Sequence, residues 1–405
     1  MFGDTPLVMI EDDASLRQLC DSLRKQPVIG VDTEADSFHH YKERLCLVQV
    51  SDPDQDYIID PLVLDGLEPL KEVLEAPEVA IVLHGGDYDV VSLKRDFGIQ
   101  IRNIFDTMIA AQFLGLPRIG LADLIGRFFG YKIDKRFQRH DWTRRPLLPE
   151  HLDYARGDTH FLLALREVLG HRLRRRGLLA AHVEECTLLE GREWKRKSDP
   201  EQDFYRVKGS KNLDADGLRV LRALWNFRDA EAQRLDRPAF KVVPDPVLVK
   251  LADSAPTTEA ALHKVVRAKS SMTRRYGAQL LEAVESGQTD ESALPARPKK
   301  PRKQSGGSSS SGGPSMDRLL GPLRDWRNAV VSDKNLSPVV VVSNQLLKEI
   351  ARAAPSSMEE LQSVPGIRQW QVRSYGQELL QIVAGVPVPT GSGKRRRRRR
   401  SGKTR

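Results

Sequence analysis

The chain has 405 residues, which is long enough for two or three domains that each bury their own core. No stretch approaches the ~18 consecutive apolar residues of a membrane-spanning helix. The net charge of +9 suggests nucleic-acid binding, but nine positive charges fall in residues 394–405, so the rest of the chain is neutral. No transmembrane helix is therefore expected, and the function of the folded part has to be inferred from motifs.

The three cysteines, Cys20, Cys46 and Cys186, are far apart and lack the spacing of zinc ligands. The N-terminus also lacks a basic flank followed by an apolar segment, which is the pattern of a secretory signal. Both observations predict a cytoplasmic protein without disulfides.

The first 200 residues carry the pattern of a mixed sheet covered by helices. Apolar runs joined by short polar connections predict three antiparallel strands at residues 27–35, 45–51 and 56–60. The pattern then alternates through a helix (67–77), a strand (80–85), a second helix (88–98) and an apolar run from Ile104 to Leu114. Helical patterns dominate from Leu121 onward, so we expect an α/β domain followed by helical domains.

Two acids end the first predicted strand. Asp32 and Glu34 are two residues apart, and side chains at this spacing lie on the same face of a strand. Neighbouring carboxylates repel each other unless a cation lies between them. An Asp-x-Glu pair at a strand end is more often simply solvated, so this pair indicates a metal site only together with other acids.

Two further acids follow the fourth predicted strand. After His84, two glycines turn the chain, and Asp87 and Asp89 lie in the first turn of the next helix. Acids at a helix N-terminus also interact favourably with the helix dipole. A dipole role and a metal-ligand role therefore both remain open here.

A tyrosine and an acid share one face of a later helix, which is predicted to begin at Pro149 and to continue beyond Leu163. Tyr154 and Asp158 are four residues apart, the spacing that stacks side chains on a helix. The alternative is a tyrosine at the core margin beside a surface acid. Clustered carboxylates suit Mg²⁺ or Mn²⁺, and phosphodiester hydrolysis uses two such ions.

Two later segments, residues 224–281 and 323–380, resemble each other. Trp225 aligns with Trp326, and in both segments a proline and a tyrosine are separated by twenty residues. We therefore expect one small helical module that is used twice.

The second module has a feature that the first lacks. A Pro-Gly turn at Gly366 opens a helix, and the free N–H groups of a helix N-terminus bind phosphate well. Arg368 and Arg373 would add charge, and Trp370 a stacking surface. These residues predict RNA docking, with a spacer or a dimer contact as the alternative for the modules.

Two basic segments flank the second module. Residues 289–315 contain a Lys/Arg cluster and a Gly/Ser-rich stretch, which predict a flexible linker. Residues 387–405 include an arginine run, which predicts a disordered tail that binds nucleic acid without sequence preference.

The motifs VDTE, HGGDYD, DKRFQRHDWTRRPL and YARGD, in this order, resemble those of the ribonuclease D family of 3′→5′ exonucleases. The repeated modules resemble the HRDC domain, which this family shares with RecQ-type helicases. The resemblance covers residues 10–385. It implies a ribonuclease H-like α/β exonuclease domain (1–200) followed by two all-α HRDC-type domains (210–288 and 316–386). His140 departs from the family, which more often has serine there.

The resemblance also implies roles for individual residues. Four acids match the family's ligands for two divalent metal ions (Mg²⁺ or Mn²⁺): Asp32, Glu34, Asp89 and Asp158. Asp89 is preferred to Asp87 because it precedes VVSL, as the family pattern requires. Tyr154 matches the tyrosine that positions the attacking water. Five residues are expected to contact substrate: Trp142, Arg145, Gly366, Arg368 and Arg373.

The activity implied is a metal-dependent 3′→5′ exoribonuclease that releases nucleoside 5′-monophosphates and trims tRNA precursors and other structured RNAs. The expected partner is RNA, with neither a membrane nor an obligate protein partner. One alternative is a single-strand DNA 3′→5′ exonuclease, although the chain has no polymerase region and no Gly-rich ATP loop. The other is a non-catalytic nucleic-acid-binding adaptor, which would be expected to have lost some of the acids.

Overall fold

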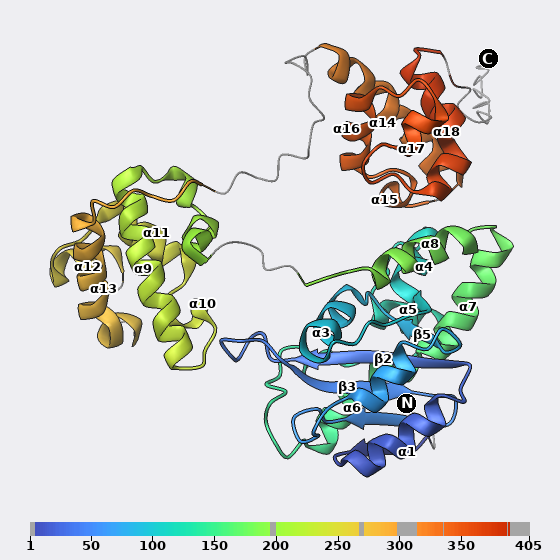
Figure 1. The fold of residues 1–405 in the computed structure, drawn as a ribbon, viewed down its shortest axis with the longest axis horizontal. Coiled ribbons are helices and arrows are strands. Elements are labelled where there is room, and N and C mark those ends of the chain that lie inside the picture. Colours follow the sequence, from blue (N-terminus) through green and yellow to red (C-terminus); the bar gives the residue numbers. More distant parts are fainter. Residues whose placement is uncertain are drawn as a thin grey trace, which may run out of the picture.

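The protein combines a six-stranded mixed sheet with two groups of helices (Figure 1). The computed structural model describes residues 5–194, 200–266, 271–297, 314–334, 336–386 and 388. Most of the expected linker and nearly all of the expected Arg-rich tail lie outside these residues. Within the described ranges, no helix is long and apolar enough to cross a membrane.

The sheet has the strand order β1-β4-β3-β2-β5-β6. Its strands are β1 (Leu7–Ile10), β2 (Val28–Ala35), β3 (Leu45–Ser51), β4 (Asp56–Ile59), β5 (Ala80–Leu83) and β6 (Ile104–Asp106). The meander predicted for β2, β3 and β4 is confirmed, because both pairs are antiparallel. The other three pairs, β1 with β4, β2 with β5 and β5 with β6, are parallel. The strand that carries the first acid pair, β2, therefore lies inside the sheet.

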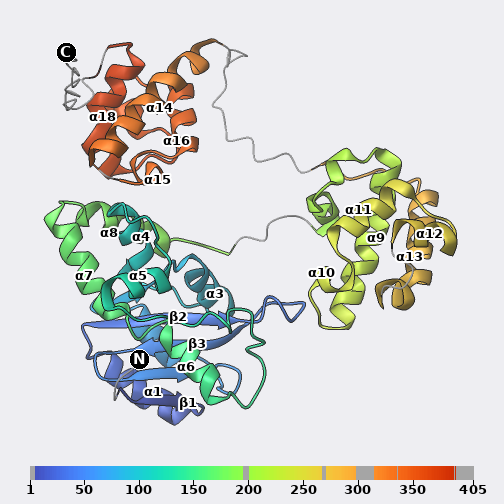
Figure 2. The same ribbon diagram turned by 180° about the vertical axis from the view of Figure 1, so that it is seen from behind.

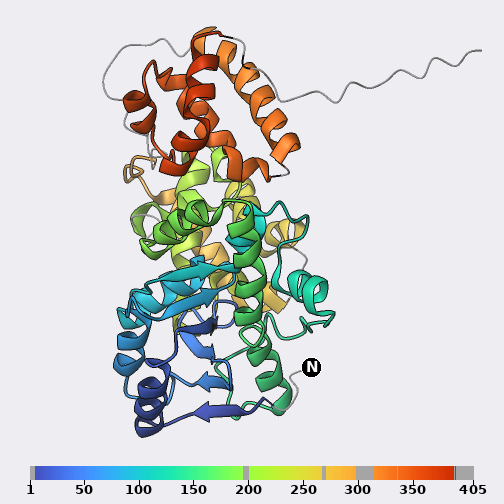
Figure 3. The ribbon, with the colours of Figure 1, turned by 90° about the vertical axis from the view of Figure 1, so that its right-hand side faces the viewer.

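Helices cover both faces of the sheet, as the views in Figures 1 and 3 show. They are α1 (Asp13–Leu23), α2 (Glu68–Leu74), α3 (Asp87–Phe97), α4 (Thr107–Phe113), α5 (Leu121–Phe129), α6 (Pro149–Gly157), α7 (Leu162–Arg175) and α8 (Leu179–Glu190). Apolar side chains of α1, α2, α3 and α8 form one core with Ile29 and Val31 of β2. On the other face, α6 packs with Trp142 against Leu47 and Ile58. This alternation along the strands lets helices pack on both faces, as in the helix-covered α/β domain that the sequence predicted.

Several elements differ from the sequence expectation. β1 and α1 were not predicted, and the run from Ile104 to Leu114 forms only a short strand before α4 begins. The reason is Asp106, whose carboxylate accepts hydrogen bonds from the N–H groups of Met108 (2.8 Å) and Ile109 (2.9 Å). An aspartate that caps a helix in this way ends the strand.

The helix that begins at Pro149 is also shorter than predicted. It ends at Gly157, and a new helix, α7, begins at Leu162. Asp158 is therefore the C-cap residue that follows the first helix, and it does not lie within a continuous helix.

The two helical groups are copies of one module, as the sequence repeat predicted. The first comprises α9 (Ala215–Arg234), α10 (Ala239–Val242), α11 (Asp245–Ser254), α12 (Glu259–Val265) and α13 (Ser271–Thr289). The second comprises α14 (Pro314–Lys334), α15 (Pro338–Val341), α16 (Asn344–Ala353), α17 (Met358–Gln362) and α18 (Gln369–Val383).

A buried arginine occupies the same place in both modules. In the first, Arg228 donates to the carbonyl of Val243 (3.1 Å) and to a carboxylate oxygen 17 residues ahead in the chain. In the second, Arg327 donates to the carbonyl of Val342 (3.1 Å) and to a side-chain amide oxygen, again 17 residues ahead. Because the same long-range bonds recur, the repeat extends to the internal packing of each module.

Both modules contact the α/β domain, each at a different place (Figures 1 and 2). The connection between β2 and β3 reaches the first module, where His40 Nδ1 lies 2.7 Å from Asp236 Oδ2. The Tyr41 hydroxyl also donates to Asp229 (2.9 Å). The second module packs against α4 and α8, and its apolar side chains join those of the α/β domain in one cluster.

Candidate active site

The first acid pair lies in the second half of β2, where strand alternation places Asp32 and Glu34 on one face. Gly30 precedes them on the same face and allows a helix to approach closely. A Cβ atom at Gly30 would lie only 3.2 Å from Leu162 Cβ and from the carbonyl oxygen of Thr159. The start of α7, and with it Asp158, is thereby brought next to β2.

A hydrogen-bond network fixes the break between α6 and α7. The hydroxyl of Ser51, at the end of β3, lies 2.7 Å from Thr159 Oγ1 and 2.6 Å from Asp56 Oδ1. Asp56 also accepts from Arg156 Nε (2.9 Å), and His160 Nδ1 lies 2.9 Å from Asp56 Oδ2. Although burial works in the opposite direction, hydrogen bonds from His160, Ser51 and Arg156 hold the pKa of Asp56 below its usual range. Asp56 therefore stays ionised and holds residues on both sides of Asp158.

The two acids at the start of α3 have different environments. Gly85, at φ +69°, makes the turn after β5, a left-handed conformation that glycine adopts without steric cost. Asp89 is only 5% exposed and accepts a 2.5 Å hydrogen bond from the Thr33 hydroxyl. The side chain of Asp87 is 68% exposed and pairs with Arg192 (3.1 Å). Of the two, only Asp89 is directed toward β2.

The four acids influence one another electrostatically. Burial, followed by the charges of Asp89, Asp158 and Glu34, raises the pKa of Asp32 well above its usual value. Burial, followed by the charges of Asp158 and Asp89, does the same to the pKa of Glu34. Burial, followed by the charge of Asp89, raises the pKa of Asp158 to about 7, and burial raises the pKa of Asp89 to about 6. No cationic side chain is among these influences, so the site has an excess of negative charge.

Tyr154 lies beside this cluster on α6. Its ring stacks on Trp142 (5.8 Å between centroids) and meets the edge of Phe137 (5.8 Å). Burial raises the pKa of its hydroxyl, and the charges of Asp158, Glu34 and Asp32 raise it further. The hydroxyl therefore keeps its proton at neutral pH and can donate a hydrogen bond.

The donor set suits hard divalent cations, which prefer carboxylate oxygens. As the side chains stand, however, no three His, Cys, Asp or Glu groups in the described ranges are arranged to hold a metal ion together. Carboxylates that repel one another separate, and Asp89 is drawn to Thr33. Shared coordination therefore requires these side chains to rotate, and the metal-ligand roles stay a prediction.

Two family models match the chain. One, described as 3'-5' exonuclease, matches residues 7–174, and one, described as HRDC domain, matches residues 217–284 and 316–383. A protein named "Ribonuclease D" from Granulibacter bethesdensis is 30% identical over 93% of this chain and 92% of its own length. The chain belongs to the ribonuclease D family.

Solved structures agree with this assignment. The crystal structure of Escherichia coli RNase D is 26% identical, with a TM-score of 0.66, and the match covers 94% of this chain and 99% of that one. The catalytic core of RRP6 from Trypanosoma brucei is 31% identical, with a TM-score of 0.62, over 70% of this chain and 80% of that one.

Longer relatives match as well. The "Exosome complex component 10 homolog" of Drosophila melanogaster is 34% identical over 63% of this chain, which spans only 29% of that protein's length. The ribonuclease D match over nearly the full chain, together with the exonuclease domain, confirms the enzyme class predicted from the motifs. The protein is a 3′→5′ exoribonuclease of the ribonuclease D family.

Two of the expected substrate contacts are engaged within the exonuclease domain. Trp142 is 1% exposed and packs beneath Tyr154, so it supports the tyrosine instead of facing solvent. Within the described ranges, its indole Nε1 has no hydrogen-bond acceptor in good geometry. Burial raises the pKa of Glu34, and the nearby indole lowers that pKa by a smaller amount. Arg145 forms a two-pronged ion pair with Asp60, which is fully buried.

The three substrate contacts expected in the second HRDC module are also engaged within the molecule. Arg368 pairs with Glu185 (2.9 Å) and Arg373 with Glu184 (3.4 Å), both on α8 of the exonuclease domain. Gly366, at φ +88°, makes the turn that leads into α18. A carboxylate of the same chain, that of Glu184, meets this helix N-terminus.

Sequence reasoning missed the residues that position the acids. Thr33 lies between Asp32 and Glu34, and nothing in its own segment indicates a bond to a residue 56 positions away. The Asp56 network likewise joins residues about a hundred positions apart. The only signal available was that Arg156 lies in the YARGD motif and that His160 follows Asp158 by two residues.

Proposed function

We propose that this enzyme hydrolyses RNA from the 3′ end with two divalent metal ions, Mg²⁺ or Mn²⁺, and releases nucleoside 5′-monophosphates. The observation that carries the proposal is that the segments bearing the acids pack together: Asp89 accepts a hydrogen bond from Thr33, between Asp32 and Glu34, and the chain beside Asp158 packs on Gly30. Such ions supply an activated water and stabilise the charge on the departing oxygen. The residues proposed to hold them are Asp32, Glu34, Asp89 and Asp158.

Tyr154 is proposed to orient the attacking water. Its raised pKa keeps the hydroxyl protonated, and its ring is held between Trp142 and Phe137. A rigid hydrogen-bond donor beside the acids fixes the direction from which water approaches phosphorus. Such positioning removes part of the entropic barrier of hydrolysis.

The proposed substrates are tRNA precursors and other structured RNAs, and the proposed location is the cytoplasm. The E. coli relative is described as an exoribonuclease involved in structured RNA processing. Three buried free cysteines fit a reducing compartment. The HRDC modules and the basic tail are proposed to add contacts to the nucleic-acid backbone.

A cleavage assay tests the proposal. Matched RNA and DNA single strands labelled at the 5′ end are incubated with Mg²⁺ or Mn²⁺, and in parallel with a chelator. A ladder of RNA that shortens from the 3′ end, and that disappears with the chelator, supports the proposal. Preferential shortening of DNA, or binding without shortening, contradicts it.

The Tyr154→Phe variant is expected to lower the rate of cleavage about 10²-fold, the scale of a positioned proton-handling group. RNA affinity should stay close to that of the wild type, because the ring still packs between Trp142 and Phe137. Single-turnover rates and fluorescence anisotropy in chelator measure the two quantities. A large loss of affinity would show that Tyr154 holds the substrate instead of the water.

Deletion of residues 391–405 is expected to flatten the salt dependence of RNA binding, because it removes all nine charges of the basic run. Each phosphate contact that is lost reduces the slope of log K against log salt by about 0.7–0.9. Single-turnover cleavage at saturating RNA should not change, since no proposed catalytic residue lies in the tail. An unchanged salt slope would exclude the tail from binding.

A further inference from the structure

The second HRDC module is attached to the exonuclease domain by two adjacent acids of α8. The carboxylate of Glu184 accepts hydrogen bonds from the backbone N–H groups of Gln369 (2.6 Å) and Trp370 (3.0 Å) at the start of α18. Arg373, one turn further along the same helix, pairs with it as well. This carboxylate therefore caps a helix of another domain.

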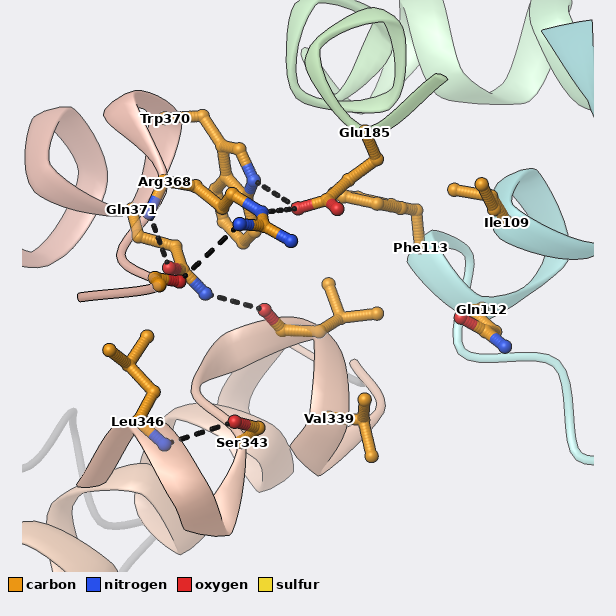
Figure 4. Close-up of a pocket in the computed structure, with 12 residues that line it drawn as sticks. Ile109, Gln112, Phe113, Glu185, Val339, Ser343, Leu346, Arg368, Trp370 and Gln371 are labelled. Carbon is orange, nitrogen blue, oxygen red and sulfur yellow. Dashed lines mark hydrogen bonds and ion pairs between the residues drawn. The ribbon is translucent and has the colours of Figure 1, made fainter. Parts of the chain in front are cut away.

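Glu185 completes the attachment, as the close-up in Figure 4 shows. Its Oε1 accepts from Arg368 Nε (2.9 Å) and lies 3.3 Å from the indole Nε1 of Trp370. Among the described residues, the polar partners of the two acids across this contact belong to the start of α18 and the turn before it, which the sequence predicted to bind phosphate. A helix N-terminus with arginines nearby is a common recognition site for phosphate groups.

The apolar part of the contact is incomplete. The Phe113 ring meets Trp370 (5.3 Å between centroids), but beside them a cavity of about 190 Å³ lies between the α4 residues and Val339 (Figure 4). This pocket is partly open to solvent, so apolar packing does not cover this part of the contact. Apolar side chains of the module and of the exonuclease domain also form one cluster, so we expect the charged contacts to add to this packing where the pocket interrupts it.

We propose that Glu184 and Glu185 form an acidic latch that holds the second HRDC module closed, and that a nucleic-acid backbone opens it by taking the carboxylates' place. A phosphodiester offers the same N–H and guanidinium groups an equivalent anion. Binding of RNA to α18 and attachment of α18 to α8 are then mutually exclusive. The inference rests on the proposed function only in taking RNA as the natural competitor.

The test uses the full chain, with small-angle X-ray scattering for compactness and anisotropy of labelled RNA in chelator for affinity. The latch variant carries Glu184→Gln and Glu185→Gln. The matched control carries Glu167→Gln on α7, where the side chain is 67% exposed and pairs with the adjacent Arg166. Inorganic polyphosphate serves as a competitor that is not a substrate.

The wild type and the control are expected to be compact at low salt and to expand when RNA or polyphosphate is added. The latch variant should be expanded without any ligand. It should also bind RNA about three- to tenfold more tightly, because a few exposed ion pairs no longer compete. Glu185→Arg should open the protein as well. Adding Arg368→Glu restores an opposite-charge pair at the same place and should close the protein again. General damage to the fold would not be reversed in this way.

A latch variant that stays compact overturns the proposal, as does a wild type that stays compact when saturated with RNA. If polyphosphate opens the wild type but RNA does not bind, the latch is supported and RNA as the substrate is contradicted. The two failures are therefore distinguishable.

Discussion

The Asp32→Ala variant is expected to cleave RNA about 10³-fold more slowly than the wild type, the scale seen when a key charge-stabilising group is removed from an active site. Asp32 is the acid whose pKa responds to the charges of all three others, so it lies at the centre of the cluster. Its loss should not harm the fold. Removing one of four repelling carboxylates should leave the free energy of unfolding of the chelated protein unchanged or higher.

The matched control is Asp87→Ala, two residues from Asp89 on the same helix. Asp87 is exposed and pairs with Arg192, so its removal should change cleavage less than about twofold. Single-turnover kinetics measure the cleavage rate of each variant. Thermal unfolding in chelator measures the stability of each. If the Asp87 variant is the inactive one, or if Asp32→Ala is inactive only because it unfolds, the assignment of the cluster is wrong.

The chelated protein is expected to lose stability as the pH rises from about 5 to about 8. The pKa of Asp158 is raised to about 7 and that of Asp89 to about 6. Because these values exceed the pKa of an unfolded aspartate, the folded state binds more protons between about pH 4 and pH 7. The stabilisation is complete below this range and is lost as the pH rises through 6 and 7. The melting temperature should fall by on the order of 5 °C.

Mg²⁺ or Mn²⁺ should reverse this trend, since a bound cation stabilises ionised carboxylates and binds only the folded state. The rise in melting temperature on adding metal should be large near pH 8 and small near pH 5, where protons compete for the same oxygens. A variant with Asp89→Asn and Asp158→Asn should lose most of both effects. A metal-induced shift that is the same at every pH would show that the cations bind elsewhere.

The fold class could be predicted because its signals are local. The apolar runs of β2, β3 and β4 and the repeated module at 224–281 and 323–380 are visible in the sequence, and both expectations are confirmed. The ends of elements were harder. The start of α4 depends on the cap at Asp106, and the break after Gly157 depends on Ser51 and Asp56, about a hundred residues earlier.

The same contrast between local signals and long-range contacts applies to the candidate site. Chain order and motif resemblance brought the four acids and Tyr154 together, but no local pattern indicates how far apart their carboxylates stand or that Thr33 holds Asp89. The expected phosphate site at Arg368 was physically sensible. What the sequence did not reveal is that Glu184 and Glu185, which look like ordinary acids of an exposed helix face, meet it.

Anomalous diffraction from crystals soaked with Mn²⁺ and a nucleoside 5′-monophosphate tests the central claim most directly. The account predicts two Mn²⁺ peaks about 3.5–4 Å apart, bound by Asp32, Glu34 and Asp158 and approached by Asp89, with the Tyr154 hydroxyl beside them. Mn²⁺ that binds away from these carboxylates, in protein whose cleavage of RNA depends on Mn²⁺, would contradict it.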